Sequence, residues 1–376
     1  MYLYCSKYCS KQYQLKKIII SVSNDLTTDQ RVAKVCNTLH NAGFQILLIG
    51  RKLQNSKPLK RKYQTKRISL FFHKGILFYA ELNIRLFFLL LFLKKNVLLA
   101  NDLDTLLPNY MVSKLLRKKL VFDSHELFSE IPELVHRPFV KKIWIRLENQ
   151  MLPKLKNAYT VCDSIANYYA KKYQTKFNVI RNLPVKKNSI SFSKLSFNTS
   201  GKKIIIYQGA VNMGRGLEFI IDTMPFLSNC ILFIVGTGDI IKKLKKLVAH
   251  KNLEKKVKFL GQLPPKKLQT ITPLATLGIS IEEDLGLNYR FALPNKIFDY
   301  IQAEVPILVS DLPEMKRIVT DYKVGEIVTN REPKKVAKQI KELLKKDFYS
   351  ELKAAKKTLI WEHQENELLA IFKNLK

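Results

Sequence analysis

The 376-residue chain is long enough for two domains of ordinary size, each with its own buried core. Its 65 Lys and Arg exceed its 31 Asp and Glu, and the net charge of +34 indicates partners such as nucleic acid, an anionic membrane surface or phosphorylated small molecules. A general bias toward Lys explains this charge equally well, and the five Cys lack the spacing of a disulfide framework or a zinc site, which favours a reducing cytoplasm.

Short β-branched runs alternate with helical patterns through the first half of the chain. The segment before Lys17 is polar and rich in Tyr, so we expect no cleavable signal peptide. Predicted strands follow at 17–23, 44–50, 68–73, 96–100, 120–123, 158–162 and 178–182, with helical spacing over pieces such as 28–41 and 104–117. Nearly continuous apolar strands of this kind belong to parallel sheets that are covered on both faces.

The most apolar stretch, 76–93, is interrupted by Glu81, Asn83 and Arg85. Its unbroken part is far shorter than the roughly 20 residues that span a bilayer. A buried or half-buried helix is the simpler expectation. The alternative is a helix that docks on a membrane with Lys94 and Lys95 at the lipid surface.

The stretch 184–201 is rich in Ser, Asn and Lys and breaks the alternation, so we interpret it as a linker. Predicted strands resume at 203–209, 230–236, 257–261, 277–283, 306–310 and 325–328. The sequence therefore predicts an α/β protein with two doubly wound, Rossmann-like domains. Ligands of such folds bind at the carboxyl ends of the strands, and we expect the site in the cleft between the domains.

Three loops at strand ends of the second half have the composition of anion-binding turns. The glycines of the first two loops are Gly209, Gly214, Gly216, Gly236 and Gly238. Arg215 opens the helix after the first loop, and Pro294-Asn295-Lys296 begins a helix after the third. One glycine turn between strand and helix is common, but three such loops along one sheet edge favour a bound anion.

Lys296 is unusual because a cation at a helix N-terminus is unfavourable unless an anion lies beside it. A bound diphosphate would provide that anion. Asp299 follows one turn later and has two interpretations. It forms an i,i+3 pair with Lys296, or its carboxylate accepts hydrogen bonds from the hydroxyls of a nucleotide ribose.

Blocks along nearly the whole chain resemble the retaining glycosyltransferases of the family 4 type, the glycosyl transferases group 1, which have the GT-B fold. In the second half the matching blocks are "YQGAVNMGRGLEFII", "FIVGTGD", "VKFLGQLP" and "ALPNKIFDYIQAEVPILVSDLPEMKRIV". In the first half they are "SVSNDLTTDQRVAKVCNTLHNAGFQILLIGR", "LLANDLDTLLP", "FDSHELFSEIPEL" and "LENQMLPKLKNAYTVCDSIANYY", and "WEHQENELLAIF" resembles the final helix. The resemblance implies an acceptor-side domain at 1–190, a nucleotide-sugar-binding domain at 200–350, and a segment at 351–376 whose helix crosses back to the first domain.

The resemblance also implies roles for individual residues. Arg215 takes the basic position at the donor diphosphate, and Asp299 takes the second acid of the Glu-x7-Glu motif, which binds ribose. His125 matches a histidine near the donor sugar, although a lone histidine after a strand is more often structural. Glu126 follows it as a weaker candidate on the acceptor side.

Several positions depart from the family pattern. The first acid of the motif is replaced by Phe291, and an arginine common in relatives is replaced by Ala210. The candidates for the lost carboxylate are Glu282, Glu283 and Asp284. The glycine-rich loop after the first strand is replaced by Ser23-Asn24-Asp25, so Asn24, Asp25 and the nearby Arg31 are acceptor-side candidates. Asp29, like Arg31, stands in the first turn of the next helix and is a possible acceptor-side residue, but helix capping and solvation explain both residues about equally well.

The reaction implied is transfer of a sugar from a nucleoside diphosphate sugar to a glycan or lipid-linked saccharide, with retention of configuration, in surface polysaccharide biosynthesis. Arg215, Lys296 and helix amides would stabilise the diphosphate leaving group, so we expect no metal and no cofactor. We also expect a cytoplasmic protein with peripheral contact to the inner face of an anionic membrane, and no nucleic-acid partner. The alternatives are a nucleotide-sugar epimerase and a catalytically eroded GT-B protein that binds anionic glycolipid or membrane.

Overall fold

The computed structural model describes residues 16–27, 29–131, 134, 137–186, 192, 199 and 201–375. The chain forms two compact units. The first runs to Asp123 and adds Leu155–Asn157 and the chain end from Phe372, and the second comprises Ser124–Lys154 and Ala158–Ile371. Most of the predicted linker 184–201, together with Cys5 and Cys9, lies outside the described residues.

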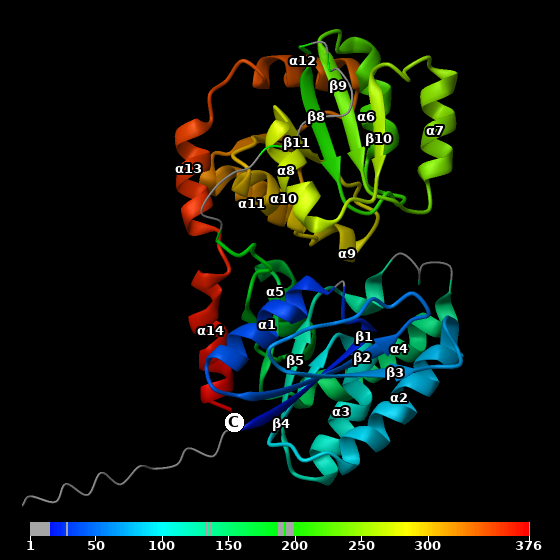
Figure 1. The fold of residues 1–376 in the computed structure, drawn as a ribbon, viewed down its shortest axis with the longest axis vertical. Helices are drawn as coiled ribbons and strands as arrows, with labels where there is room; N and C mark the ends of the chain where they lie inside the picture. The colour runs from blue at the N-terminus through cyan, green and yellow to red at the C-terminus, as the bar shows by residue number, and fades with distance from the viewer. Residues whose placement is uncertain are drawn as a thin grey trace, which may run out of the picture. The chain divides into compact units, whose positions relative to one another are not determined.

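A seven-stranded sheet occupies the first half of the chain (Figure 1), in the order β3-β2-β1-β4-β5-β6-β7. Its strands are β1 (Lys17–Asp25), β2 (Gln45–Lys52), β3 (Gln64–Ser69), β4 (Val97–Asn101), β5 (Lys119–Ser124), β6 (Ala158–Thr160) and β7 (Asn178–Val179). Pairing is parallel from β3 to β5 and between β6 and β7, and β1 registers Ile18 with Ile46 and Val97.

The strand expected at 68–73 is displaced toward the N-terminus, because the edge strand β3 is Gln64–Ser69. An edge strand is not covered on both faces, so the polar run "QTKRIS" forms a strand without the apolar signature used to find the others. The apolar residues Leu70–Phe72 instead lead toward the next helix.

The helices of the first half are α1 (Gln30–Asn41), α2 (Gly75–Phe92), α3 (Leu103–Leu115), α4 (Pro138–Met151) and α5 (Asp163–Tyr173), with single 3-10 turns η1 (Phe128–Glu130) and η3 (Leu152–Lys154). Leu86 and Leu90 of α2 and Val112 of α3 pack on Ile19 and Leu98 of the sheet. The capping interpretation of Asp29 is confirmed, since its carboxylate accepts a 3.0 Å hydrogen bond from the Val32 amide.

A six-stranded parallel sheet occupies the second half, in the order β10-β9-β8-β11-β12-β13 (Figure 1). Its strands are β8 (Lys203–Gln208), β9 (Cys230–Val235), β10 (Val257–Gly261), β11 (Leu277–Ser280), β12 (Ile307–Ser310) and β13 (Gly325–Val328). The central strands are almost entirely buried, which explains why continuous apolar runs located them correctly.

Helices cover both faces of this sheet. The helices of the second half are α6 (Leu217–Thr223), α7 (Ile241–His250), α8 (Pro265–Ile271), α9 (Leu287–Arg290), α10 (Asn295–Gln302), α11 (Pro313–Tyr322), α12 (Pro333–Leu343), α13 (Tyr349–Thr358) and α14 (Glu362–Lys373), with 3-10 turns η4 (Met224–Phe226) and η5 (Thr272–Leu274). One face packs against α6, α7 and α12, and the other against α8, α10, α11 and α13. At the end of α14, the Phe372 ring lies 6.4 Å from that of Phe44 within the first unit.

The order of strands in the second sheet defines where a ligand would bind. The chain builds outward in one direction from β8 through β9 to β10, and in the other from β11 through β12 to β13. The direction therefore changes between β8 and β11. In doubly wound sheets the loops that leave the carboxyl ends of two such strands separate and form the ligand crevice.

Candidate active site

Three charged side chains meet near the carboxyl ends of β8 and β11. Arg215 comes from the loop between β8 and α6, Glu282 lies two residues beyond β11, and Lys296 lies in the first turn of α10. The Lys296 ammonium is 2.5 Å from Glu282 Oε1, and Arg215 Nη1 is 3.7 Å from the same oxygen. Two cations thus share one carboxylate at the switch point of the sheet.

Burial of these groups is unequal. The Glu282 side chain is 0% exposed and that of Lys296 is 8% exposed, whereas Arg215 is 28% exposed. The Ser280 hydroxyl donates a 2.8 Å hydrogen bond to the second Glu282 oxygen. Arg215 is therefore the member of the cluster that solvent or a ligand reaches most easily.

The anion expected beside Lys296 is found, but it belongs to the protein. One of the two interpretations of Asp299 paired it with Lys296, whereas the structure pairs Lys296 with Glu282. A carboxylate at the N-terminus of α10 satisfies the same electrostatic requirement that we had assigned to a diphosphate. Pro294 is the N-cap residue and Asn295 the first helical residue, one position later than predicted, and Asn295 is exposed.

Aromatic rings support both cations. The Lys296 ammonium lies 4.3 Å from the centre of the Tyr207 ring, and the Arg215 guanidinium lies 5.2 Å from that of Tyr289. The Tyr207 hydroxyl donates a 2.5 Å hydrogen bond to the carbonyl of Ala210. Rings at these distances favour a cation over a neutral group.

The electrostatics of the pair follow from burial and proximity. Burial alone would raise the pKa of Glu282, but Lys296, Arg215 and Ser280 together hold it below its usual value. Burial lowers the pKa of Lys296, and Arg215 lowers it further, while Glu282 opposes both. Among the charged neighbours, Glu282 is therefore the group that favours the protonated form of Lys296.

Asp299 is held by a residue that sequence inspection did not single out. Gln208, the last residue of β8, donates a 3.1 Å hydrogen bond from its amide to Asp299 Oδ2. The Gln208 carbonyl oxygen in turn accepts a 2.7 Å hydrogen bond from Thr272. Gln208 is buried and Asp299 half-buried, so the amide fixes the carboxylate at the edge of the sheet.

The five glycines of the predicted anion-binding loops have left-handed or crowded backbones. They were expected to make space for a ligand, but at several of them the space is needed by a neighbouring loop. A Cβ on Gly236 would lie 1.8 Å from the Gly209 carbonyl, and one on Gly216 would lie 2.2 Å from that of Ile281. Gly236 and Gly216 also have φ of 144° and 68°. A Cβ on Gly238 would meet the Asn212 side chain. These glycines let neighbouring loops pack on one another, whereas the prediction assigned their space to a ligand.

Gly209 and Gly214 are also in the left-handed region, with φ of 134° and 78°. A Cβ on Gly209 would meet only the Tyr207 hydroxyl, at 3.7 Å, whereas one on Gly214 would press against Leu285 and Tyr289. Of the five positions, Gly209 has the most open surroundings. Close approach of a ligand to the backbone is therefore best accommodated there.

His125 and Glu126 directly follow β5 and belong to the second unit. Glu126 Oε2 accepts a 3.1 Å hydrogen bond from the amide of Asn288 in α9. The Asn288 carbonyl oxygen accepts a 3.1 Å hydrogen bond from the Leu127 backbone amide. Asn288, which no motif indicated, therefore fixes the loop that carries His125 and Glu126.

The acceptor-side candidates of the first unit have structural partners. Asp25 accepts hydrogen bonds from the Thr27 amide at 2.8 Å and the Thr27 hydroxyl at 2.7 Å, and a further one from Ser56. Burial opposes the effect, but these hydrogen bonds lower the pKa of Asp25 below its usual value. Asn24 is exposed and its amide lies 3.3 Å from Asp29 Oδ2.

Arg31 had two open interpretations, an acceptor-side residue or a solvated one, and the structure places its side chain in the interior. Its guanidinium donates to both carboxylate oxygens of Asp123, at 2.8 and 3.2 Å. The side chains are only 4% and 0% exposed. Arg31 is accordingly a buried structural partner of β5, because two parallel hydrogen bonds occupy one edge of its planar fork.

Two of the three carboxylates that could replace the acid missing at Phe291 have different partners. Asp284 pairs with Arg290 at 2.7 Å on the surface, and Glu282 pairs with Lys296 in the interior.

Among the described residues, no group of three or more His, Cys, Asp or Glu side chains is arranged to hold a metal ion.

Comparisons with known proteins agree with this geometry. Residues 190–358 match the family described as Glycosyl transferases group 1. No curated protein sequence matches the chain. Sucrose-phosphate synthase from Thermosynechococcus elongatus superposes with a TM-score of 0.75 at 14% identity, over 95% of this chain and 98% of that one.

Two further solved structures have the same fold. Anabaena Alr3699/HepE in complex with UDP-glucose has a TM-score of 0.72 at 13% identity, over 96% of this chain and 100% of that one. A Listeria monocytogenes protein provisionally assigned as UDP-N-acetylglucosamine 2-epimerase has a TM-score of 0.64 at 14% identity, over 95% of both chains. At these identities the structures establish the fold, and the family match concerns the half that carries Arg215, Glu282 and Lys296. The match of residues 190–358 to the glycosyl transferases group 1 family, together with the shared fold, identifies the protein as a glycosyltransferase with the GT-B fold.

Proposed function

We propose that this glycosyltransferase moves a sugar, with retention of anomeric configuration, from a nucleoside diphosphate sugar to a hydroxyl of a glycan or lipid-linked saccharide in surface polysaccharide synthesis. The observation that carries the proposal is the Arg215–Glu282–Lys296 cluster at the switch point of the second sheet. A solved structure of the same fold that holds UDP-glucose supports a nucleotide sugar as donor.

The chemistry asks mainly for stabilisation of negative charge. When the bond from the anomeric carbon to the diphosphate breaks, the leaving oxygens gain charge, and fixed cations in a dry site stabilise them. Arg215 is the accessible cation and Lys296 the buried one. Glu282 keeps Lys296 fixed, so little reorganisation is needed as the charge develops.

The remaining site residues have supporting roles in this proposal. Asp299, oriented by Gln208, would accept hydrogen bonds from ribose hydroxyls. His125 would lie beside the donor sugar, on the loop that Asn288 fixes. Neither a metal nor a cofactor is required by this mechanism, because the two cations carry the charge of the leaving group.

We further propose that the protein works in the cytoplasm at the inner face of the membrane. The net charge of +34 supports attraction to anionic lipid headgroups. Helix α2 also exposes apolar residues over much of its surface. A lipid-linked acceptor would be presented at that surface.

An epimerase is the second candidate, because a protein provisionally assigned to that activity shares the fold. Product analysis separates the two reactions. The protein is incubated with UDP-, GDP- and ADP-sugars, with and without total membrane glycolipid, and nucleoside diphosphate release and the sugar configuration are followed by nuclear magnetic resonance.

Sugar transfer with retention predicts that one nucleoside diphosphate is released only when an acceptor is present. It also predicts that the anomeric configuration of the new linkage is the same as that of the donor sugar. Epimerisation at a carbon other than the anomeric one, without an acceptor, would replace the proposal. Absence of both reactions together with tight binding to glycolipid would favour an eroded, binding protein.

A further inference from the structure

Helix α2 exposes an apolar surface, and contact of such a surface with water is unfavourable. Only Phe78, Leu82, Leu86 and Leu90 are buried, in one narrow stripe toward the sheet. The other large apolar residues with more than half of their surface exposed are Ile76, Leu77, Ile84, Phe88 and Phe92. By length and composition this is the one helix in the described part of the chain that could cross a membrane, yet its buried stripe makes it part of the first unit's core.

The polar residues of α2 are used inside the unit. Glu81 accepts hydrogen bonds from the backbone amides of Phe71 and Phe72, at 2.9 to 3.0 Å. The Asn83 amide donates to the carbonyls of Tyr79, at 2.8 Å, and Asp104, at 3.0 Å. The polar groups of the helix therefore bind protein partners, while the apolar groups outside the buried stripe face the surface. An ordinary surface helix has the reverse arrangement.

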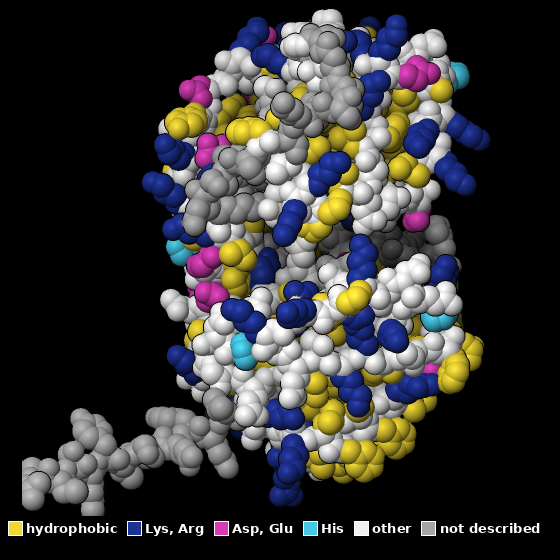
Figure 2. Space-filling model, viewed as in Figure 1, with side chains coloured by type: hydrophobic (Ala, Val, Ile, Leu, Met, Phe, Trp, Pro, Cys, Tyr) yellow, Lys and Arg dark blue, Asp and Glu magenta, His cyan; other side chains and the backbone are white. Residues whose placement is uncertain are grey.

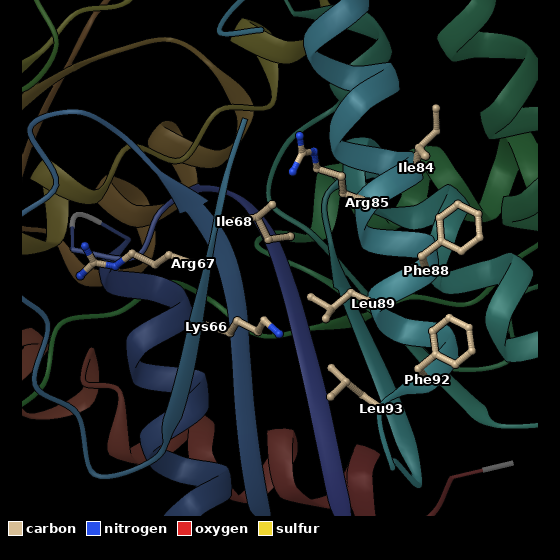
Figure 3. A pocket seen from close by; sticks show the side chains of 9 residues that line it. All are labelled: Lys66, Arg67, Ile68, Ile84, Arg85, Phe88, Leu89, Phe92 and Leu93. Atoms are coloured by element: carbon tan, nitrogen blue, oxygen red, sulfur yellow. The ribbon is translucent and has the colours of Figure 1, made fainter. Parts of the chain in front are cut away.

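A groove of about 580 Å³ lies between α2 and the edge strand β3 (Figure 3). From β3, Lys66 and Ile68 point toward α2, whereas Arg67 points to the other side of the strand (Figure 3). Across the groove lie Leu89 and Leu93, and the rings of Phe88 and Phe92 continue the apolar surface along the outer side of the helix (Figure 3). The volume is within the range of pockets that hold small ligands.

The polar lining of the groove is cationic. It consists of Lys66, Arg67 and Arg85, and no acidic side chain of the described residues lines it. Arg85 is paired with Glu81 at 2.8 Å but remains 40% exposed. In Figure 2 hydrophobic side chains gather at the lower right, where Figure 1 places α2, with Lys and Arg side chains close by. Lys74 and Lys94, which flank the helix, are exposed. Lys95, which was expected at the lipid surface beside Lys94, is instead buried, and its ammonium donates to backbone carbonyls at the end of α2.

We propose that the groove between β3 and α2 binds one anionic phospholipid, with its phosphate at Lys66 and Arg85 and a hydrocarbon chain along Ile84, Phe88 and Phe92. The inference rests on the membrane contact in the proposed function and gives that contact a site and a lipid class. An apolar surface with cations along one side matches the two chemical parts of such a lipid.

The charge pattern disfavours other occupants. Residues 1–15 contain Lys7 and Lys11 and no acidic residue, so this segment would be repelled by the groove. A second copy of a chain with a net charge of +34 would be repelled likewise. A neutral lipid would bring no phosphate charge to Lys66, and Arg85 would keep Glu81 as its anionic partner.

The test uses the full-length protein with vesicles of phosphatidylcholine, alone or mixed with phosphatidylglycerol. Phe92→Trp places a reporter on the apolar face, while the two native Trp residues, Trp144 and Trp361, are buried. With mixed vesicles we expect emission of the reporter to shift to the blue and to be quenched by brominated acyl chains. In the same background, Lys66→Glu should weaken binding about tenfold, as expected for reversal of one charge at a lipid surface.

Lys242→Glu on α7 is the matched control, since it changes the net charge equally at an exposed position of the second unit. Equal weakening by Lys66→Glu and Lys242→Glu, or an unquenched reporter on bound protein, would overturn the groove site while peripheral contact remains. Self-association without lipid that Phe88→Glu abolishes would assign the face to a second copy and also overturn it. Nucleoside diphosphate binding, measured on the same variants, is expected to be unchanged, and its absence in the wild type would count against the transferase independently of vesicles.

Discussion

Glu282 is the residue on which the candidate site most depends. Its carboxylate is fully buried, and it is the one acidic partner recorded for Lys296 in the described chain. A buried ion pair is sensitive to loss of one partner, because the other charge is left without compensation. In the proposed function, donor binding therefore depends on a residue that need not touch the donor.

Glu282→Gln is expected to make nucleoside diphosphate binding more sensitive to pH. Burial and Arg215 both lower the pKa of Lys296, and only Glu282 opposes them, with the Tyr207 ring alongside. Without the carboxylate, Lys296 loses its proton at a lower pH than in the wild type. Binding should therefore be strongest at the acidic end and weaken by about tenfold or more as pH rises, as expected for loss of a charged hydrogen bond.

Calorimetric titration of nucleoside diphosphate into both proteins at a series of pH values, from slightly acidic to alkaline, measures this difference. Glu283→Gln is the control, because Glu283 is the neighbouring carboxylate and is only half-buried. Parallel pH profiles for the wild type and Glu282→Gln would show that Glu282 does not control the protonation of Lys296.

Arg31→Met tests the corrected role of Arg31. The substitution leaves the buried Asp123 carboxylate without its guanidinium, and we expect a loss of about 3–5 kcal/mol in the free energy of unfolding. The double variant Arg31→Met/Asp123→Leu removes both charges and should recover part of that loss. Urea unfolding measures both. Equal stability of the single variant and the wild type would mean that the pair contributes little.

At the scale of elements, the sequence predicts the buried strands well and the edge strand poorly. β1, β4, β8 and β9 are continuous apolar runs because they are covered on both faces, and that pattern appears in the chain directly. β3 is polar because it lies at an edge, so only its neighbours define it. Prediction of the site is limited in the same way, because local sequence does not reveal contacts between distant segments. Arg215 and Lys296 were found from their loops. The roles of Gln208 and Asn288 and the pairing of Glu282 depend on such contacts.

The glycine loops give a prediction at this scale. Gly236→Ala would place a Cβ against the Gly209 carbonyl and also strain a residue with φ of 144°. Gly261→Ala, with φ of 67° and open space around its Cβ, has the strain alone. We expect about 1 kcal/mol lost for Gly261→Ala and at least about twice that for Gly236→Ala. Thermal unfolding compares them, and equal losses would show that the two loops are not tightly packed.

At the scale of the whole molecule, two sheets with similar topology carry different tasks. The second sheet holds the cationic cluster at its switch point, and the corresponding polar groups of the first sheet, Asp25 and Arg31, are occupied by structural partners. Composition indicated polyanionic partners but could not say where they bind. The structure offers two separate places, the cluster near β8 and β11 and the groove beside α2, and each has its own test.

The measurement that tests the central claim most directly is calorimetric binding of UDP, GDP and ADP to the wild type and to Asp299→Ala. We expect one diphosphate to bind the wild type and to lose about 1 kcal/mol or more in the variant, because a hydrogen bond to ribose is removed. Asp222→Ala is the control, since Asp222 lies on α6 in a surface pair with Lys251. Binding of none of the three diphosphates, or equal binding to all three proteins, would contradict a nucleotide-sugar site at the switch point of the second sheet.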